Sequence, residues 1–131
     1  MHTVDTVDIC LRTTAIVLDN LRVNEQRTRE AATKGYLNAT ELADYLVKKG
    51  MPFREAHEVV GKAVVFAMEM HKELHELDLS DMRRFSRKID ADVFEALKLN
   101  SALAAKNVDG GTSPKRVIKA LSAAKRSLHK K

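Results

Sequence analysis

VDTVDICLRTTAIVLDNL, residues 4–21, is the stretch that decides the fold. One set of residues in it recurs at spacings of three, four, three, four and three: Val4, Val7, Leu11, Thr14, Leu18 and Leu21. These spacings form a heptad seam, which is typical of a helix that packs lengthwise against other helices. We therefore predict a long helix here, with these six residues as its packing positions in a bundle or oligomer.

The same stretch is apolar on more than one side. A second apolar set lies beside the seam and consists of Ile9, Cys10, Ile16, Val17 and Val23. A helix on the surface of a small domain buries one stripe about 100° wide. This helix therefore requires packing neighbours on at least two sides, and Cys10 is predicted to be a buried, unreactive thiol.

The start of the chain is abrupt, because Met1-His2-Thr3 leads directly into the apolar pattern and leaves little room for a cap. Domain boundaries usually fall in polar, flexible linkers. We therefore expect the sequence to begin inside a larger protein.

Short helices with clear start and stop signals follow. Asn24 can cap a helix that stops at Gly35. Asn38 with Glu41 makes a capping-box variant for the next helix, which Gly50 ends.

Pro52 lies near the first turn of a further helix, where its fixed φ is favourable. The apolar residues of that helix share one face: Ala56, Val59, Val60, Ala63, Val64 and Ala67. Their small size, with Gly61 alongside, predicts close approach of another helix.

Beyond Leu77 the segments shorten. Each begins near a pair of possible caps: Asp78 or Ser80, Asp90 or Asp92, and Asn100 or Ser101. Asp109-Gly110-Gly111 is a break, and Ser113-Pro114 opens the last helix. No strand pair with a hairpin signal is found. The predicted fold is all-α, with one long bundle-type helix followed by a compact cluster of short helices.

Composition agrees with one mostly helical domain. Of 131 residues, 44% are hydrophobic and 5% aromatic, which is unlike a disordered chain. The net charge of +5 comes from the end of the chain, because residues 115–131 carry seven basic side chains and no acidic one. No segment approaches the ~18 apolar residues of a membrane span, and no signal segment opens the chain, so a cytoplasmic location is expected.

The histidines do not form a recognisable metal or catalytic pattern. His71 and His75 are four apart, with Glu73 and Glu76 adjacent, but no third ligand follows at a useful spacing. His57 could serve as a general base, yet the sequence places no nucleophile beside it. Ser101, Ser113 and Ser122 lie at caps or on helix faces. We predict no catalytic, metal or cofactor-binding residue in this chain.

Two features could bind anions. Residues 110–114, Gly-Gly-Thr-Ser-Pro, open a helix N-terminus but lack the spacing and the Lys of a phosphate-binding loop. The last helix is basic and could bind nucleic acid through phosphates, but no aromatic residue is interleaved for base stacking. The interpretations we favour are a capped structural turn and a solvated basic face on a packed helix.

Residues 35–65, GYLNATELADYLVKKGMPFREAHEVVGKAVV, resemble the C-terminal region of argininosuccinate lyase, a member of the fumarase/aspartase superfamily. Thr3–Asn24 resembles the last long helix of that family's central bundle, and residues 110–117 resemble its closing segment. The chain departs from the family at residues 85–90, where Arg87 stands in place of a common proline. Its lysine-rich end after Leu121 is also less typical.

The resemblance implies an enzyme that splits argininosuccinate into arginine and fumarate. The family's catalytic loop, Gly-Ser-Ser-x-Met-Pro-x-Lys-x-Asn-Pro, is missing here, as are its Thr-x-x-His region and its substrate-binding Tyr-Asn-x-Asp-x-Gln-x-x-Lys run. No catalytic residue of the family can be placed on this sequence. We expect residues 1–24 to be the last long helix of the bundle and residues 25–131 to be a small helical C-terminal domain, inactive alone.

The resemblance also implies partners: the rest of the lyase chain and a homotetrameric assembly. Two alternatives remain open. The chain could be a stand-alone helical module that self-associates or binds a partner through Val4–Leu21. It could also be a nucleic-acid binder that uses its basic tail.

Overall fold

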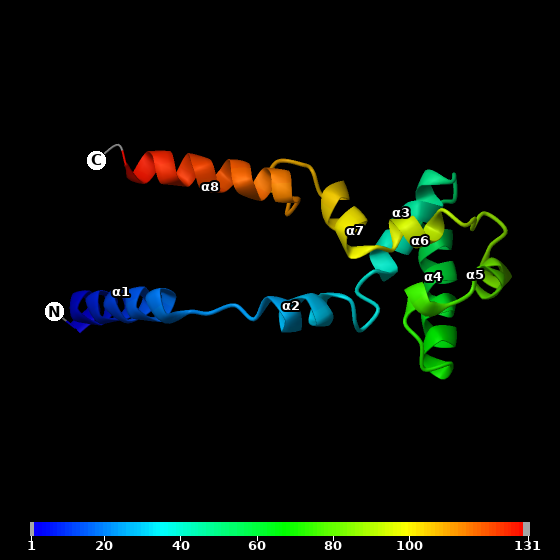
Figure 1. Cartoon of the computed structure of the whole chain (residues 1–131), viewed down its shortest axis with the longest axis horizontal. Coiled ribbons are helices and arrows are strands. Elements are labelled where there is room, and N and C mark those ends of the chain that lie inside the picture. Colours follow the sequence, from blue (N-terminus) through cyan, green and yellow to red (C-terminus); the bar gives the residue numbers. More distant parts are fainter. Residues whose placement is uncertain (1, 130–131) are drawn as a thin grey trace. The chain divides into compact units, whose positions relative to one another are not determined.

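A computed structural model describes residues 2–129, and every regular element in that range is helical. In chain order the elements are α1 (His2–Asn20), α2 (Glu25–Ala32), α3 (Ala39–Lys48), α4 (Phe53–Glu69), the 3-10 helix η1 (Leu74–Glu76), α5 (Leu79–Phe85), α6 (Val93–Ala96), α7 (Leu99–Ala105) and α8 (Pro114–Leu128). The predicted all-α fold, with one long helix and a cluster of shorter ones, is confirmed (Figure 1).

The chain divides into two compact units, and the division falls between Ala31 and Ala32, near the end of α2. The first unit consists of helices whose described side chains are exposed to solvent. Cys10 is among them, so the prediction of a buried thiol is wrong for this chain. The apolar faces of α1 were predicted to require packing neighbours on at least two sides, and the first unit itself supplies none.

The second unit contains the hydrophobic core, which α3 and α4 form together with α5, α6 and η1 (Figure 1). Six large side chains are completely buried there: Leu42, Leu46, Leu74, Met82, Ile89 and Val93. They come from α3, η1, α5 and α6 and from the loop between α5 and α6. The core therefore joins residues that lie about fifty positions apart in the sequence.

The small-residue face of α4 packs as predicted. Ala56, Ala63 and Ala67 are fully buried, and Val60 is nearly so. Because these side chains are short, α3 can lie close to the axis of α4. Gly61 takes no part in that approach, because a Cβ built on it meets no atom within 4 Å. The prediction for Gly61 is therefore wrong.

Capping residues close in sequence explain where several helices begin and end. The Asn24 side chain accepts a hydrogen bond from the backbone N–H of Arg27 at 3.0 Å, as a cap of α2 should. Gly50 has φ +80, and the N–H of Met51 reaches back to the carbonyl of Leu46, which closes α3. Both predictions are confirmed.

Other caps differ from the predictions. Asn38 precedes α3 but makes no side-chain cap bond, so the predicted capping box with Glu41 is absent there. A reciprocal box occurs instead at η1, between Glu73 and Glu76. The helix α7 begins at Leu99, ahead of Asn100, because its N-cap position is Lys98.

Candidate functional site

The heptad seam of α1 is open to solvent along its whole length. All six predicted packing residues, Val4, Val7, Leu11, Thr14, Leu18 and Leu21, are exposed, and Leu11 reaches 66%. The polar strip of the same helix carries an ion pair of 2.8 Å between Asp8 and Arg12. Exposed apolar surface of this extent marks an interaction face in soluble proteins.

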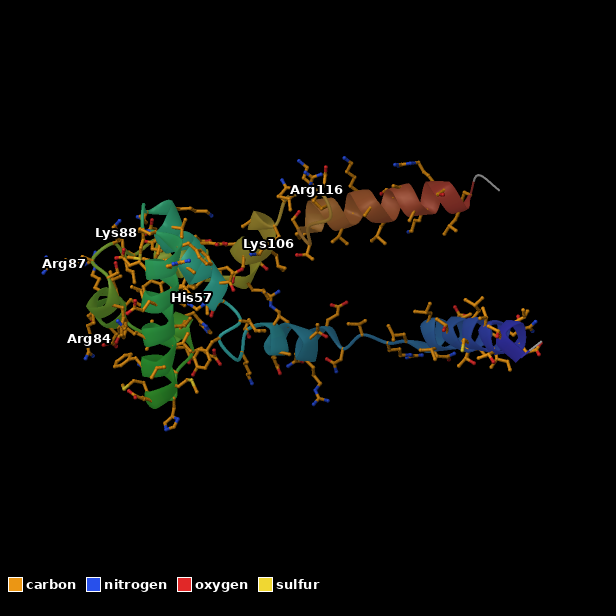
Figure 2. The ribbon with its side chains drawn as sticks, turned by 180° about the vertical axis from the view of Figure 1, so that it is seen from behind. His57, Arg84, Arg87, Lys88, Lys106 and Arg116 are labelled. Atoms are coloured by element: carbon orange, nitrogen blue, oxygen red, sulfur yellow. The ribbon has the colours of Figure 1, made fainter. Side chains whose placement is uncertain are left out.

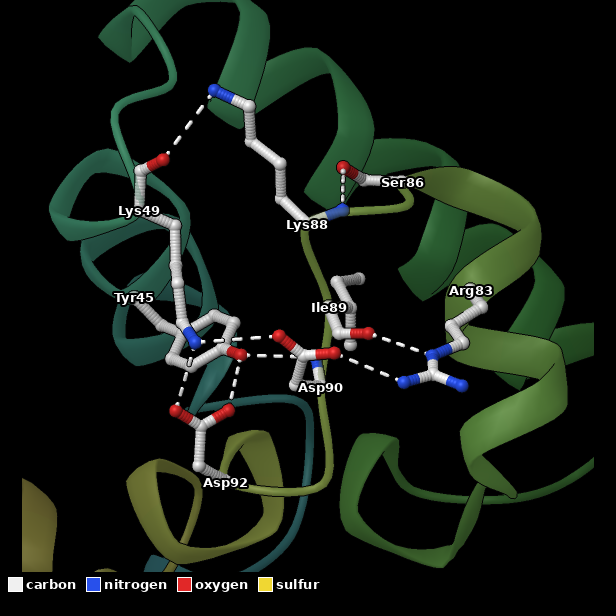
Figure 3. Close-up of polar contacts among 8 residues, drawn as sticks. All are labelled: Tyr45, Lys49, Arg83, Ser86, Lys88, Ile89, Asp90 and Asp92. Atoms are coloured by element: carbon white, nitrogen blue, oxygen red, sulfur yellow. Dashed lines mark hydrogen bonds and ion pairs between the residues drawn. The ribbon is translucent and has the colours of Figure 1, made fainter.

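A network of hydrogen bonds and ion pairs connects residues 86–92 to α3 (Figure 3). The Tyr45 hydroxyl donates to Asp92 at 2.5 Å and accepts the backbone N–H of Asp90 at 3.0 Å. The Lys49 ammonium lies 3.0 Å from the Asp92 carboxylate and 3.5 Å from that of Asp90.

This geometry shifts the pKa values of the three side chains in the network. Burial raises the pKa of the Tyr45 hydroxyl, and its bond to Asp92 raises it further. The pKa of Asp92 lies below its ordinary range because Tyr45 and Lys49 both bond to the carboxylate. The bond to Asp92 also raises the pKa of Lys49. Each group is held in the protonation state it already has at neutral pH, so the network suits a structural role better than proton transfer.

Two basic residues extend this fastening. The Arg83 guanidinium donates to the carbonyl of Ile89 at 3.0 Å and to the Asp90 carboxylate at 2.9 Å. The Lys88 ammonium donates to the carbonyl of Gly50 at 2.8 Å, and so places a positive charge at the negative end of α3. Lys88 lies in the segment where the sequence departs from the family pattern.

The two glutamates considered for metal binding beside His71 and His75 accept backbone hydrogen bonds instead. The Glu73 carboxylate accepts the N–H groups of Gly35 at 3.0 Å and Tyr36 at 3.1 Å, while Glu76 accepts the N–H of Glu73 at 2.8 Å. Within residues 2–129 no three His, Cys, Asp or Glu side chains are grouped to hold a metal ion. His57 lies on the exposed side of α4, where its ring is 6.3 Å from that of Phe53 (Figure 2).

The Gly-Gly-Thr-Ser-Pro segment forms a tight joint between α7 and α8. Ser113 is buried, and its side chain caps α8 by accepting the N–H of Arg116, as predicted. The guanidinium of Arg116, which is labelled in Figure 2, donates hydrogen bonds to the Asn107 side chain at 3.0 Å and to Asp109. A Cβ at Gly111 would lie 2.1 Å from the carbonyl oxygen of Lys106, so only glycine fits there. The segment is thus a capped structural turn.

The helix α8 is amphipathic and buries none of its side chains. Its apolar stripe consists of Val117, Leu121, Ala124 and Leu128, and Leu128 is 75% exposed. At about 100° per residue, Lys115, Lys119 and Arg126 fall on the opposite side. The basic face predicted from the sequence therefore exists, and the apolar stripe opposite it has no cover among the described residues.

An apolar pocket of about 250 Å³ lies between α3, α6 and α7 in the second unit. Its apolar lining includes Leu37, Phe94, Leu97, Leu99 and Leu103. An ion pair of 3.1 Å between Glu41 and Lys106 borders it. Neither this pocket nor the Tyr45 network could be predicted from the sequence, because both depend on segments that only the fold brings together.

These features define the class of protein as an all-α structural domain. Its described polar groups mainly form hydrogen bonds and ion pairs with one another, and its first and last helices have exposed apolar faces. The chain belongs to the family of the argininosuccinate lyase C-terminal domain, whose sequence pattern matches residues 36–104, more than half of the chain. None of the described helices is long and apolar enough to span a membrane.

Among solved structures, a variant of EDDS lyase with bound fumarate is similar. The match has a TM-score of 0.74 at 28% sequence identity and covers 82% of this chain. It covers 23% of the EDDS lyase chain, so the present chain spans less than a quarter of that protein's length. Both comparisons agree with the resemblance first noted in residues 35–65.

Proposed function

We propose that this chain is the C-terminal region of an argininosuccinate lyase and that its role is structural. The intact enzyme would cleave argininosuccinate into arginine and fumarate, as a cytoplasmic homotetramer of arginine biosynthesis. The family match over residues 36–104 carries this proposal. The bound fumarate named for the similar EDDS lyase agrees with the same product class.

Within that enzyme, residues 1–24 would supply a helix of the central bundle and residues 25–131 a domain beside it. The observation that supports this role is the exposed seam of α1. A helix apolar on several sides is stable in water only when other helices cover it. We infer that Val4, Val7, Leu11, Thr14, Leu18 and Leu21 pack against neighbouring helices of an oligomer.

The seam can be tested with a matched pair of variants. Leu11→Gln with Leu18→Gln removes two seam residues, whereas Arg12→Gln with Asp19→Gln places the same side chains one position along, on the polar strip. Gln is a good helix former, so both variants keep helix propensity. In analytical ultracentrifugation we expect the first variant to dissociate at concentrations where the wild type and the second stay associated. If both variants sediment with the same mass, the proposal that the seam residues mediate association is wrong.

Catalysis is expected to need the rest of the lyase. The purified 131-residue chain should release no fumarate from argininosuccinate above a buffer blank, as followed by ultraviolet absorbance. Grafted in place of the corresponding region of a complete argininosuccinate lyase, it should restore the assembly and activity that the truncated enzyme lacks. A graft that folds but stays inactive and unassembled would contradict the proposal.

The same exposed seam also favours a second candidate, a stand-alone helical self-association module. Such a module would associate equally well with or without the truncated lyase. Mixing the chain with the truncated enzyme separates the two functions, because only a lyase domain would form a mixed complex through α1.

A further inference from the structure

We propose that the pocket between α3, α6 and α7 binds a small, uncharged aromatic molecule that carries one hydrogen-bonding group. The pocket has a volume of about 250 Å³, whereas a cavity of about 150 Å³ already holds benzene. It therefore has room for a two-ring molecule such as indole. All the residues that line it lie between Ala32 and Thr112, inside the second unit. The site needs neither the α1 seam nor the rest of a lyase, so it is independent of the proposed function.

Most of the lining is apolar and comes from several segments of the second unit. Leu37 lies before α3, Phe94 lies in α6, Leu97 follows α6, and Leu99 and Leu103 lie in α7. Leu97 is buried, whereas the Phe94 and α7 side chains are half-buried, so part of their apolar surface stays in contact with water. An aromatic ligand would cover this surface and pack against the Phe94 ring.

The charged residues of the lining favour a ligand without charge. Glu41 is paired with Lys106 at 3.1 Å, and Lys98 is paired with Glu95 at 2.5 Å. A carboxylate ligand would meet Glu41, whose side chain is only 14% exposed, and an ammonium ligand would meet Lys106. Either ion would lose water without gaining an unpaired partner of opposite charge. A neutral molecule avoids this loss.

Asn38 supplies a polar group that can orient the ligand. It precedes α3 and lines the pocket, but its side chain makes no cap bond to the helix. The amide oxygen is therefore available to accept a hydrogen bond from a ligand N–H or O–H. A mainly apolar lining with a few polar groups is the usual form of a small-molecule site.

One wall of the pocket is formed by residues 33–38, the segment between α2 and α3, which we call the strap (Figure 1). Three of its residues line the pocket: Thr33, Leu37 and Asn38. The strap consists of turns. Its position therefore depends on the bonds that tie it to the core.

The residues that follow α4 hold the strap in place. The Glu73 carboxylate accepts the N–H groups of Gly35 at 3.0 Å and Tyr36 at 3.1 Å, and the Tyr36 hydroxyl donates to the carbonyl of Lys72 at 3.1 Å. Within the described range, the two non-glycine residues with positive φ are Tyr36 (+58) and His71 (+52), and His71 precedes Lys72. Such backbones persist only where the surrounding structure enforces them, and they cluster at ligand sites. These bonds thus fix one wall of the pocket in the absence of a ligand.

Titration of the full chain with indole, followed by heteronuclear NMR, tests the site. We expect saturable shifts of the backbone N–H signals of Phe94, Leu97 and Leu103. The dissociation constant should be about 0.1–1 mM, as expected for a ligand of this size. The absence of saturable shifts, or shifts centred on other residues, would overturn the proposal.

Filling the pocket gives a matched pair of variants. Ala102→Phe places a ring in the pocket and should abolish indole binding. Ala104→Phe is the control, because Ala104 lies on the same helix, is exposed and does not line the pocket. The control should bind indole as the wild type does. Undiminished binding by Ala102→Phe would place the ligand elsewhere and would contradict the proposal.

Asn38→Ala tests the ligand class without adding bulk. It should weaken indole binding about two- to tenfold, but it should leave binding of N-methylindole, which has no N–H, unchanged. Benzoate and benzylammonium should bind at least about tenfold more weakly than indole, because each would bring an unpaired charge into the pocket. Equal effects of Asn38→Ala on both indoles, or tighter binding of either ion, would show that the assigned ligand class is wrong.

Glu73→Gln tests the strap. An amide offers only one acceptor oxygen for the N–H groups of the strap, so indole binding should weaken about two- to tenfold. Glu69→Gln, at an exposed position at the end of α4, is the matched control and should bind as the wild type does. Equal affinities of both variants would show that the strap is not a wall of the binding site.

A protein segment is the alternative occupant of the pocket. If the lining signals shift on mixing with a truncated lyase but not with indole, the pocket is an interface and the proposal is wrong. The double Gln variant of Leu11 and Leu18 should bind indole as the wild type does, because the pocket lies in the second unit. Failure of the seam and failure of the pocket are therefore distinguishable.

Discussion

At the scale of single residues, Tyr45 joins α3 to the segment of Asp90 and Asp92 through one oxygen atom. Its hydroxyl donates to Asp92 and accepts from the backbone of Asp90, while its ring lies beneath Lys49 at 5.3 Å. A buried hydroxyl with two partners is costly to remove, because each partner loses a bond that water cannot fully replace.

Tyr45→Phe is therefore expected to lower the free energy of unfolding by about 1–2 kcal/mol, as measured by urea denaturation. Tyr36→Phe is the matched control, because the Tyr36 hydroxyl makes a single bond, at 3.1 Å, to the carbonyl of Lys72. Loss of this single hydrogen bond should lower the free energy of unfolding by less than Tyr45→Phe does. A larger effect at Tyr36 would mean that the Tyr45 network contributes little.

The lowered pKa of Asp92 predicts a dependence of stability on acid. The carboxyl has an ordinary pKa of 3.8 in the unfolded chain and a lower one in the folded chain. Its stabilising effect is therefore complete above that ordinary value and is lost as the pH falls through the folded-state pKa. In denaturation curves measured below about pH 4, Asp92→Asn should flatten the fall in stability relative to the wild type. Parallel curves would contradict this assignment.

At the scale of elements, α3 and α4 show how small residues and caps set the packing. Lys88 caps the C-terminal end of α3 from a segment 38 positions away, and the alanines of α4 admit α3 closely. Gly61 lies on the outer side of α4 and has no steric reason to be glycine.

Gly61→Ala should stabilise the second unit by about 0.5–1 kcal/mol, because alanine favours the helix and meets no neighbour. Ala63→Leu, two positions along on the buried face, should destabilise it by about 1–3 kcal/mol through overpacking. Thermal unfolding of both variants against the wild type measures the contrast. A destabilising Gly61→Ala would indicate that another chain covers this side.

Lys88→Met should cost about 0.5–1 kcal/mol, because it removes the charge that faces the end of α3 but keeps the aliphatic stem. Arg87→Met is the control, since Arg87 is its exposed neighbour. Urea denaturation should leave the control within about 0.5 kcal/mol of the wild type. A similar loss in both variants would show that the cap is not the cause.

Helix ends were predictable where the signal is local. Asn24, Gly50 and Ser113 each act within four residues, so their roles can be inferred from spacing alone. The ties from Tyr45 to Asp92 and from Glu73 to Gly35 cross 47 and 38 positions. They depend on which helices meet in three dimensions, which no local pattern contains. The exposure of Cys10 was missed for a related reason: apolar neighbours in sequence do not supply neighbours in space.

At the scale of the whole molecule, the core of the second unit contrasts with the open faces of α1 and α8. A chain that spans less than a quarter of a related enzyme is expected to leave such faces uncovered. If copies associate through them, folding and assembly are linked by mass action. The melting temperature should then rise with protein concentration over about a hundredfold range, and the double Gln variant of the seam should lose that dependence. Concentration-independent melting of the wild type would argue against assembly.

The two tyrosines have a practical consequence for such measurements. The chain has no Trp, and Tyr36 and Tyr45 both lie in the second unit, each with a hydrogen-bonded hydroxyl. Intrinsic fluorescence will therefore report on that unit alone, whereas far-ultraviolet circular dichroism also records the nineteen residues of α1. Recording both signals on one sample separates the melting of the long helix from that of the core without any label.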